Sequence, residues 1–231
     1  MRGIVEEPAG LRYVPDFLSE AQEDWLLERL VTLEYGEVRM LGQVARRVVR
    51  HYGTSYHFET GAVMPGEPIP DWLEPVRARC AALLERPTAD LAEALATFYP
   101  PGASIGWHRD APAFGDVVGV SLGSPSPMRF QLGKGDERRV WEQWLEPRSA
   151  YVLAGPVRTR WQHHIPAVRE PRYSLTFRTL RRGFGGRRRS LAGEGAGGLV
   201  TGPAGGGSTP AHGSSPAHGT NLADGRGEPD V

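Results

Sequence analysis

The stretch Arg172-Tyr173-Ser174-Leu175-Thr176-Phe177-Arg178 alternates polar and apolar residues from end to end. In an extended strand successive side chains point to opposite faces, so Tyr173, Leu175 and Phe177 can pack into a core while the other four residues share the second face. At about 3.3 Å per residue, the two arginine Cα atoms lie at most about 20 Å apart. Their long side chains can lean toward each other, so the stretch predicts a β-strand whose polar face suits a small diacid.

Short apolar or alternating runs, separated by glycine, proline and charged turns, fill the chain before this strand. Such spacing is typical of β-sandwiches and barrels. The runs span residues 94–99, 105–110, 117–122, 128–132, 140–145, 151–153 and 159–163. The sequence therefore predicts a mainly β fold.

Two helices are predicted before these runs, after a short strand over residues 10–14. Ser19-Glu20-Ala21-Gln22 has the form of a capping box, and apolar residues recur at helical spacing from there to Gly36. The second helix covers residues 71–86, and its apolar stripe includes the single cysteine, Cys80, which we interpret as a buried, inert thiol. Both helices are expected to support a sheet, so the fold class is α+β with a mainly β core.

His108 and Asp110 are candidate metal ligands. Residues two apart in extended backbone point to the same side, so the imidazole and the carboxylate can converge. A second histidine would complete a ligand set that suits non-heme Fe(II), because it leaves positions open for oxygen and a cosubstrate. His163 and His164 compete for this role, since neighbours on a strand face opposite ways. The alternative is that the His-x-Asp triplet arose by chance and binds nothing.

The order of these residues resembles a known family. His108-x-Asp110, His163 and Arg172-x-Ser174-x-Thr176-Phe177-Arg178 are similar to the HxD…H…RxNxTxR signature of the AlkB-type Fe(II)/2-oxoglutarate dioxygenases. The resemblance also includes Tyr99-Pro100-Pro101-Gly102 and covers roughly residues 10–182. The family usually has asparagine where this chain has Ser174, and it often has asparagine where this chain has Thr97. The hydrogen bonding around the cosubstrate is therefore expected to differ.

The resemblance implies a double-stranded β-helix, or jelly roll, with the metal bound inside it. It implies Fe(II) held by His108, Asp110 and His163, the histidine that matches the family's Trp-Gln-His pattern. The cosubstrates would be 2-oxoglutarate and molecular oxygen. An arginine suits a carboxylate because it offers two parallel charge-assisted hydrogen bonds. The residues expected to contact 2-oxoglutarate are Tyr99, Arg172, Ser174 and Arg178.

The reaction implied by the resemblance is oxidative removal of N-alkyl groups from nucleic-acid bases, with repair of alkylated DNA as the expected role and RNA as a further target. Hydroxylation of the alkyl carbon releases an aldehyde and the free base, and reaching that carbon requires a flipped or unpaired base. The family's nucleotide-recognition lid corresponds to residues 37–56, predicted to be irregular, where Tyr52 and Tyr56 could stack on a base. Trp107 could line the pocket. The alternatives are a solvated edge strand and, for Trp107, core packing.

Two rival functions stay open at this point. The same chemistry could act on RNA or protein, or a jelly roll without catalysis could bind modified nucleic acid. The formal net charge is zero, from 27 basic and 27 acidic residues, so no broad basic surface predicts strong nonspecific binding of nucleic acid. Any nucleic-acid contact is therefore expected to be local.

The composition predicts one folded domain, residues 1–182, which the resemblance implies is a dioxygenase domain, followed by a disordered tail rich in glycine, proline and serine, residues 183–231. The tail has too few apolar residues to offset its chain entropy. A lone cysteine and the lack of a long apolar run predict a cytoplasmic monomer without a disulfide, a signal peptide or a membrane span.

Overall fold

The computed structural model describes residues 6–40, 43–57 and 62–183, which fall within one compact unit. Apart from its first residue, the predicted tail lies outside the described residues. With η for 3-10 turns, the elements in chain order are β1 (Leu11–Val14), α1 (Glu20–Leu30), β2 (Gly36–Met40), β3 (Gln43–His57), β4 (Ala62–Pro65), η1 (Asp71–Leu73), α2 (Glu74–Leu83), η2 (Thr88–Asp90), β5 (Leu91–Tyr99), β6 (Ile105–His108), β7 (Phe114–Gly123), β8 (Ser126–Leu132), η3 (Gly135–Glu137), β9 (Arg139–Leu145), β10 (Ala150–Leu153), α3 (Gly155–Thr159), β11 (Gln162–Ile165) and β12 (Arg172–Leu180).

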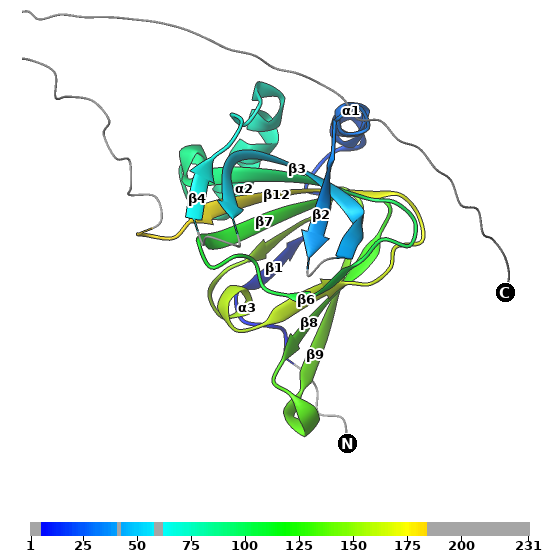
Figure 1. The fold of residues 1–231 in the computed structure, drawn as a ribbon, viewed down its shortest axis with the longest axis vertical. Coiled ribbons are helices and arrows are strands. Elements are labelled where there is room, and N and C mark those ends of the chain that lie inside the picture. Colours follow the sequence, from blue (N-terminus) through cyan, green and yellow to red (C-terminus); the bar gives the residue numbers. More distant parts are fainter. Residues whose placement is uncertain (1–5, 41–42, 58–61, 184–231) are drawn as a thin grey trace, which may run out of the picture. The chain divides into compact units, whose positions relative to one another are not determined.

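The strands form two antiparallel sheets (Figure 1). The larger sheet has the order β1-β10-β7-β12-β5-β3-β2, with β4 paired to β3, and the smaller has the order β6-β11-β8-β9. Strands that are neighbours in space are distant in sequence, since β12 lies between β5 and β7 while β11 lies between β6 and β8. This interleaving of two sheets is that of a jelly roll, so the predicted mainly β fold is confirmed.

Two buried apolar clusters hold these layers together. One lies between the larger sheet and the helices α1 and α2, and it includes Leu30, Cys80, Leu175 and Phe177 (Figure 1). The other lies between the two sheets and includes Phe130. Burial raises the pKa of the Cys80 thiol, which therefore stays protonated and inert, as predicted. Because Leu175 and Phe177 face the helices, the polar residues of β12 face the interior between the sheets.

Helix α1 begins as the sequence predicts but ends earlier. The capping box is present: the Gln22 N–H donates to Ser19 Oγ (3.2 Å), and the Ser19 N–H donates to Gln22 Oε1 (3.0 Å). The helix ends at Leu30 rather than near Gly36. The chain turns after Leu30, and the Tyr35 hydroxyl donates to the Leu30 carbonyl (2.9 Å). Within the described part of the chain, every helix is too short or too polar to cross a membrane.

Two other predicted elements start or end at different residues. Helix α2 is shorter than the predicted 71–86, because Asp71–Leu73 forms a 3-10 turn and the helix stops at Leu83. The strand predicted over 159–163 is wrong in its first half. Pro156 stands in the first turn of α3, where its fixed φ favours a helix, and the strand β11 follows.

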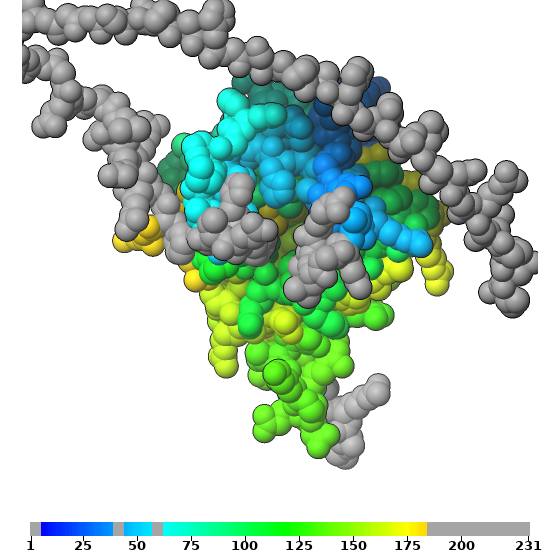
Figure 2. All heavy atoms as spheres, viewed as in Figure 1, coloured from blue at the N-terminus to red at the C-terminus, as the bar shows by residue number. Residues whose placement is uncertain are grey.

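Of residues 37–56, predicted to be irregular, 37–40 lie instead in β2 and 43–56 in β3 of the larger sheet, and 41–42 lie outside the described residues. β2 is an edge strand, and β3 pairs with β5 before it continues into a hairpin with β4. Figure 2 shows β2–β4 in light blue and β8–β9 in green on the same face of the molecule. The edge-strand alternative was therefore correct for β2, whereas β3 is an inner strand.

Candidate active site

Strands β6 and β11 bring the two predicted histidine ligands together. His108 and His163 are opposite each other in the register of these strands, with ring centroids 4.2 Å apart. Asp110 follows β6 by two residues, and its Oδ2 lies 3.7 Å from His163 Nε2. Three side chains from two separate parts of the sequence thus meet on the inner side of the smaller sheet.

The two carboxylate oxygens of Asp110 have different surroundings. Oδ1 accepts hydrogen bonds from Arg178, whose Nε and Nη2 lie 3.0 and 2.8 Å away. Oδ2 is buried and has no hydrogen-bond partner among the described residues. Burial by itself would raise the pKa of Asp110, but Arg178, His163 and Arg158 together outweigh it and hold the pKa below its ordinary value. Asp110 is therefore an anion with one oxygen still available.

Both histidines are neutral at physiological pH. Burial, followed by the nearby His108, lowers the pKa of His163 to about 3. Burial is also the main cause of the lowered pKa of His108. The Nδ1–H of His108 donates to the Gly106 carbonyl at 2.8 Å, which leaves the lone pair on Nε2. A neutral imidazole with a free ring nitrogen is the form that binds a metal.

His164 points away from this cluster. Its Nδ1 donates to the Ile105 carbonyl at 2.8 Å, and its ring lies against Trp107, with centroids 4.9 Å apart. The Arg138 guanidinium lies over the Trp107 ring, with its Cζ 5.5 Å from the ring centroid. His163 rather than His164 is therefore the histidine beside Asp110. Trp107, suggested from sequence as a pocket residue, packs instead with His164 on the opposite side of the smaller sheet.

The donor set fits a divalent metal, although the donors are slightly too far apart. Two ligands at about 2.1 Å from an octahedral ion and at right angles lie roughly 3.0 Å apart, whereas Asp110 Oδ2 and His163 Nε2 are 3.7 Å apart. Over the described ranges no group of three or more His, Cys, Asp or Glu side chains is placed to hold a metal ion as it stands. A shift below 1 Å would bring these two donors to the required distance, and the unpartnered Oδ2 has no competing hydrogen bond to lose.

Arg172 is a buried cation on the same face of β12 as Arg178, and it forms no ion pair with the described residues. Its side chain is 1% exposed, its Nη2 donates to Ser121 Oγ at 3.0 Å, and its Cζ lies 5.2 Å from the Tyr99 ring centroid. Its Nε has no hydrogen-bond partner in the part of the chain that the structure covers. A buried charge is stable only when it is paired and hydrogen-bonded, so Arg172 is suited to bind an anion.

Three small hydroxyl residues form a row beside Arg172. Ser174 on β12 lies between Thr97 on β5 and Ser121 on β7 in the strand register, and all three are buried. Ser174 and Thr97 are the two positions that depart from the family signature, and the structure places them side by side. Ser121 was not identified by sequence reasoning, although the alternation of residues 117–122 places it on the face of the strand opposite to that of Val118 and Val120.

Tyr151 is a second residue that sequence reasoning missed. It faces Gly119 across β10 and β7, and a Cβ at Gly119 would lie only 2.2 Å from Tyr151 Cζ. The glycine therefore makes room for the ring in the interior. Burial raises the pKa of Tyr151 to about 12 despite the nearby Arg172, so the phenol keeps its proton. Its hydroxyl can donate a hydrogen bond in the same interior region.

Arg158, also missed, fixes the segment that follows Asp110. From α3 its buried guanidinium donates to the carbonyls of Ala111 (2.9 Å), Phe114 (2.7 Å) and Gly115 (2.8 Å). These three hydrogen bonds hold the chain between β6 and β7. No motif marks this role, because its partners are backbone atoms that any residue type could supply.

The predicted base-stacking pair is wrong in one member. Tyr52 is buried in the cluster under the helices, so it cannot stack on a base. Tyr56 lies on the site's side of the sheet, with its ring 6.5 Å from Phe114, which lies 5.4 Å from Arg178 Cζ. Strict alternation would place Tyr52 and Tyr56, four residues apart, on the same face. The positive φ of Gly53 (+78°) interrupts the strand between them and accounts for the difference.

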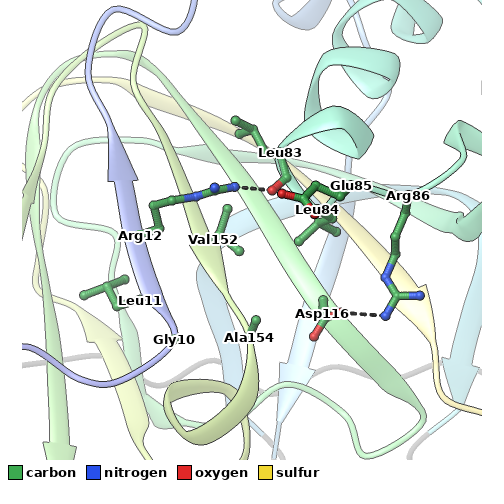
Figure 3. Close-up of a pocket in the computed structure, with 10 residues that line it drawn as sticks. All are labelled: Gly10, Leu11, Arg12, Leu83, Leu84, Glu85, Arg86, Asp116, Val152 and Ala154. Carbon is green, nitrogen blue, oxygen red and sulfur yellow. Dashed lines mark hydrogen bonds and ion pairs between the residues drawn. The ribbon is translucent and has the colours of Figure 1, made fainter.

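A surface hollow of about 510 Å³ lies away from this cluster (Figure 3). It is lined by β1 and β10 and by the C-terminal end of α2, and Arg12 donates across it to the Leu83 carbonyl. Arg86 pairs there with Asp116 at 3.2 Å. None of the predicted site residues lines this hollow.

Comparison with known proteins gives a consistent result. A family model described as the 2OG-Fe(II) oxygenase superfamily matches residues 10–188. The Mus musculus protein named tRNA (carboxymethyluridine(34)-5-O)-methyltransferase ALKBH8 is 30% identical over 172 residues, which is 71% of this chain and 25% of that protein. An Arabidopsis thaliana protein named Alkylated DNA repair protein ALKBH8 homolog is 28% identical over 182 residues, which is 68% of this chain and 51% of that one.

The solved structure titled "The structure of OsALKBH1" has the same fold. It matches with a TM-score of 0.56 at 18% identity, covering 76% of this chain and 99% of that chain. This chain spans only about a quarter to about a half of the length of the curated relatives named above.

Proposed function

Because the chain belongs to the 2OG-Fe(II) oxygenase superfamily, as a member of AlkB type, we propose that it removes N-alkyl groups oxidatively from nucleic-acid bases. One observation carries the proposal. An anionic Asp110 with a free Oδ2 and two neutral histidines lie in the same interior as the unpaired Arg172. That arrangement has donors for a divalent metal and a cation for a dicarboxylate.

The ligands of the metal would be His108 Nε2, Asp110 Oδ2 and His163 Nε2. Since both imidazoles are neutral and the carboxylate is ionised, no proton has to leave before the metal binds. When bound, Fe(II) with 2-oxoglutarate and oxygen supplies the oxidising power that hydroxylates a substrate carbon. Arg178 holds Asp110 through Oδ1 and thus directs Oδ2 toward the metal position.

Arg172 would bind a carboxylate of 2-oxoglutarate. Its free Nε and its buried position favour a charge-assisted hydrogen bond with an anion that enters from solvent. Tyr99 lies next to the guanidinium, and Ser174 lies in the adjacent hydroxyl row. Arg178, the other predicted cosubstrate contact, is already engaged with two carboxylates, so its role here is to orient Asp110.

The names of the relatives support the proposed substrate class. One is named for tRNA and another for alkylated DNA repair, so a nucleic acid is the favoured substrate, with alkylated DNA as the first candidate and RNA as the second. Tyr56, near Phe114 and Arg178, is the aromatic residue of β3 that we propose to contact the base. A dealkylation would end with release of an aldehyde and the unmodified base.

The test uses the purified full chain with Fe(II), 2-oxoglutarate and oligonucleotides carrying 1-methyladenine or 3-methylcytosine, in DNA and in RNA of the same sequence. We expect stoichiometric succinate, formaldehyde and repaired base, and none of them from His108→Ala. Repair of the RNA alone would favour the second candidate. Succinate without repair of either strand would assign the oxidation to another substrate, such as a protein, and binding without any succinate would contradict the proposed reaction.

A further inference from the structure

Glu93 is a buried carboxylate on the same face of the larger sheet as the proposed metal site. On β5 it lies opposite Arg178 of β12 in the strand register, and its side chain is 1% exposed. A carboxylate so far removed from water is stable only where cations and donors compensate its charge. No motif of the sequence singles out this residue.

Two neighbours compensate the charge of Glu93. Arg178 Nη1 donates to Oε2 at 2.6 Å, and His51 Nδ1 donates to Oε1 at 3.1 Å. The His51 side chain on β3 is 46% exposed. Burial alone would lower the pKa of Arg178, but Glu93 and then Asp110 raise it, so the guanidinium keeps its charge.

The same guanidinium reaches the proposed metal ligand. Its Nε and Nη2 donate to Asp110 Oδ1, while Nη1 is held by Glu93. A continuous chain of contacts therefore runs from the partly exposed His51 on β3, through Glu93 and Arg178, to Asp110.

We propose that Glu93 is a positioning residue for the metal site. By holding Nη1, it fixes the plane of the Arg178 guanidinium so that only Oδ1 of Asp110 is engaged and Oδ2 stays free. Without Glu93, Arg178 has a single anionic partner, and an isolated arginine–carboxylate pair favours the two-pronged geometry that occupies both oxygens. This inference rests on the proposed function, because it assigns Oδ2 to the metal.

The experiment measures Mn(II) binding by the full chain with isothermal titration calorimetry, since Mn(II) is a divalent ion that does not oxidise during the titration. We expect Glu93→Gln to weaken Mn(II) affinity by about 10–100-fold, the usual effect of losing a residue that orients a ligand. The matched control is Glu142→Gln, which removes the same charge from the exposed pair with Arg129 (2.7 Å). It should bind Mn(II) as the wild type does.

A double-mutant cycle separates positioning from simple loss of charge. If Glu93 acts through Arg178, Glu93→Gln should change Mn(II) affinity by less than about threefold in an Arg178→Met background, whereas a direct electrostatic effect would persist there. Melting temperatures establish that each variant is folded, and Glu93→Asp replaces Glu93→Gln if the latter does not fold. Wild-type affinity in the folded Glu93 variant overturns the inference. Failure of the wild-type chain itself to bind Mn(II) would overturn the proposed function instead.

Discussion

At the scale of single residues, the site depends on two groups that are incompletely paired in the protein's interior. Asp110 gives one oxygen to Arg178 and keeps the other free, and Arg172 gives one hydrogen bond to Ser121 and keeps Nε free. Buried polar atoms without partners are rare and destabilising, so their presence near one another indicates a site for a charged ligand. Both groups are therefore the ones that we propose to bind the metal and the cosubstrate.

Arg172→Met tests the cosubstrate contact. The change removes the cation while keeping most of the side-chain volume, so the loss of a buried charge-assisted pair should weaken 2-oxoglutarate binding by about 2 kcal/mol or more. We expect the KM for 2-oxoglutarate to rise by at least about tenfold, measured as initial rates of succinate release. Arg129→Met, which alters an exposed arginine, is the control and should leave this KM unchanged. An unchanged KM in Arg172→Met would remove Arg172 from the site.

His163 predicts how stability depends on pH in the metal-free protein. Its pKa is lowered to about 3 by burial and by His108, so below its ordinary value of about 6.5 the unfolded chain binds a proton that the folded chain does not. The free energy of unfolding should therefore fall as pH decreases, by up to about 2 kcal/mol between pH 6.5 and pH 5 from this residue. His108, whose pKa is also lowered, acts in the same direction.

Urea unfolding of metal-free protein at pH 6.5 and pH 5 measures this dependence. Asp110 also has a lowered pKa, but its ordinary value of 3.8 places its contribution below this window. In His163→Gln the difference between the two pH values should be smaller than in the wild type. Equal differences in the two proteins would show that His163 is not the buried neutral group described here.

At the scale of elements, packing in the interior depends on the neighbouring strands β7 and β10 of the larger sheet. Gly119 on β7 leaves space that the Tyr151 ring fills, and this ring lies in the interior near Arg172. A larger residue at position 119 would push the ring away or separate the strands. The space for the Tyr151 ring thus depends on one small residue in a strand that is otherwise rich in valine.

Gly119→Ala tests that packing. The new Cβ would lie 2.2 Å from Tyr151 Cζ, so one of the two must move. Overpacking of a well-packed interior typically destabilises by about 1–3 kcal/mol, which should appear as a lower urea midpoint with an unchanged slope. In a Tyr151→Ala background the ring is absent, so Gly119→Ala should lower the free energy of unfolding by less than it does in the wild-type background. A Gly119→Ala variant as stable as the wild type would contradict this account.

At the scale of the whole molecule, two sheets of different size divide the site between them. The smaller sheet supplies His163 and His108, with Asp110 just beyond it, and the larger sheet supplies Arg172, Arg178 and the hydroxyl row. The helices pack behind the larger sheet, against apolar residues that include Leu175 and Phe177 of β12. Support and chemistry therefore lie on opposite faces of β12.

Truncation after Arg182 tests whether this unit is sufficient. The removed residues, 183–231, are rich in glycine and poor in apolar side chains, so their loss should take no core contact away. We expect a shortened chain with the same cooperative melting transition and the same rate of succinate release as the full chain. A broad, noncooperative transition would show that the dioxygenase domain extends beyond residue 182.

The sequence alone determined the mainly β fold and the two helices, and it named the candidate metal ligands and arginines, because these depend on local periodicity and on the order of a short signature. The alternation of 172–178 placed two arginines on one face without any tertiary information. Boundaries such as the end of α1 at Leu30 were less well predicted, since capping and packing decide where a periodic segment stops.

Only the tertiary structure decided which of two adjacent histidines faces Asp110, that Tyr52 belongs to the core, and that Glu93 holds Arg178. Each of these depends on strand register between segments distant in sequence, such as β5 with β12 and β6 with β11. Register is fixed by the packing of whole faces rather than by any one residue, so a linear pattern contains the candidates but not their pairing.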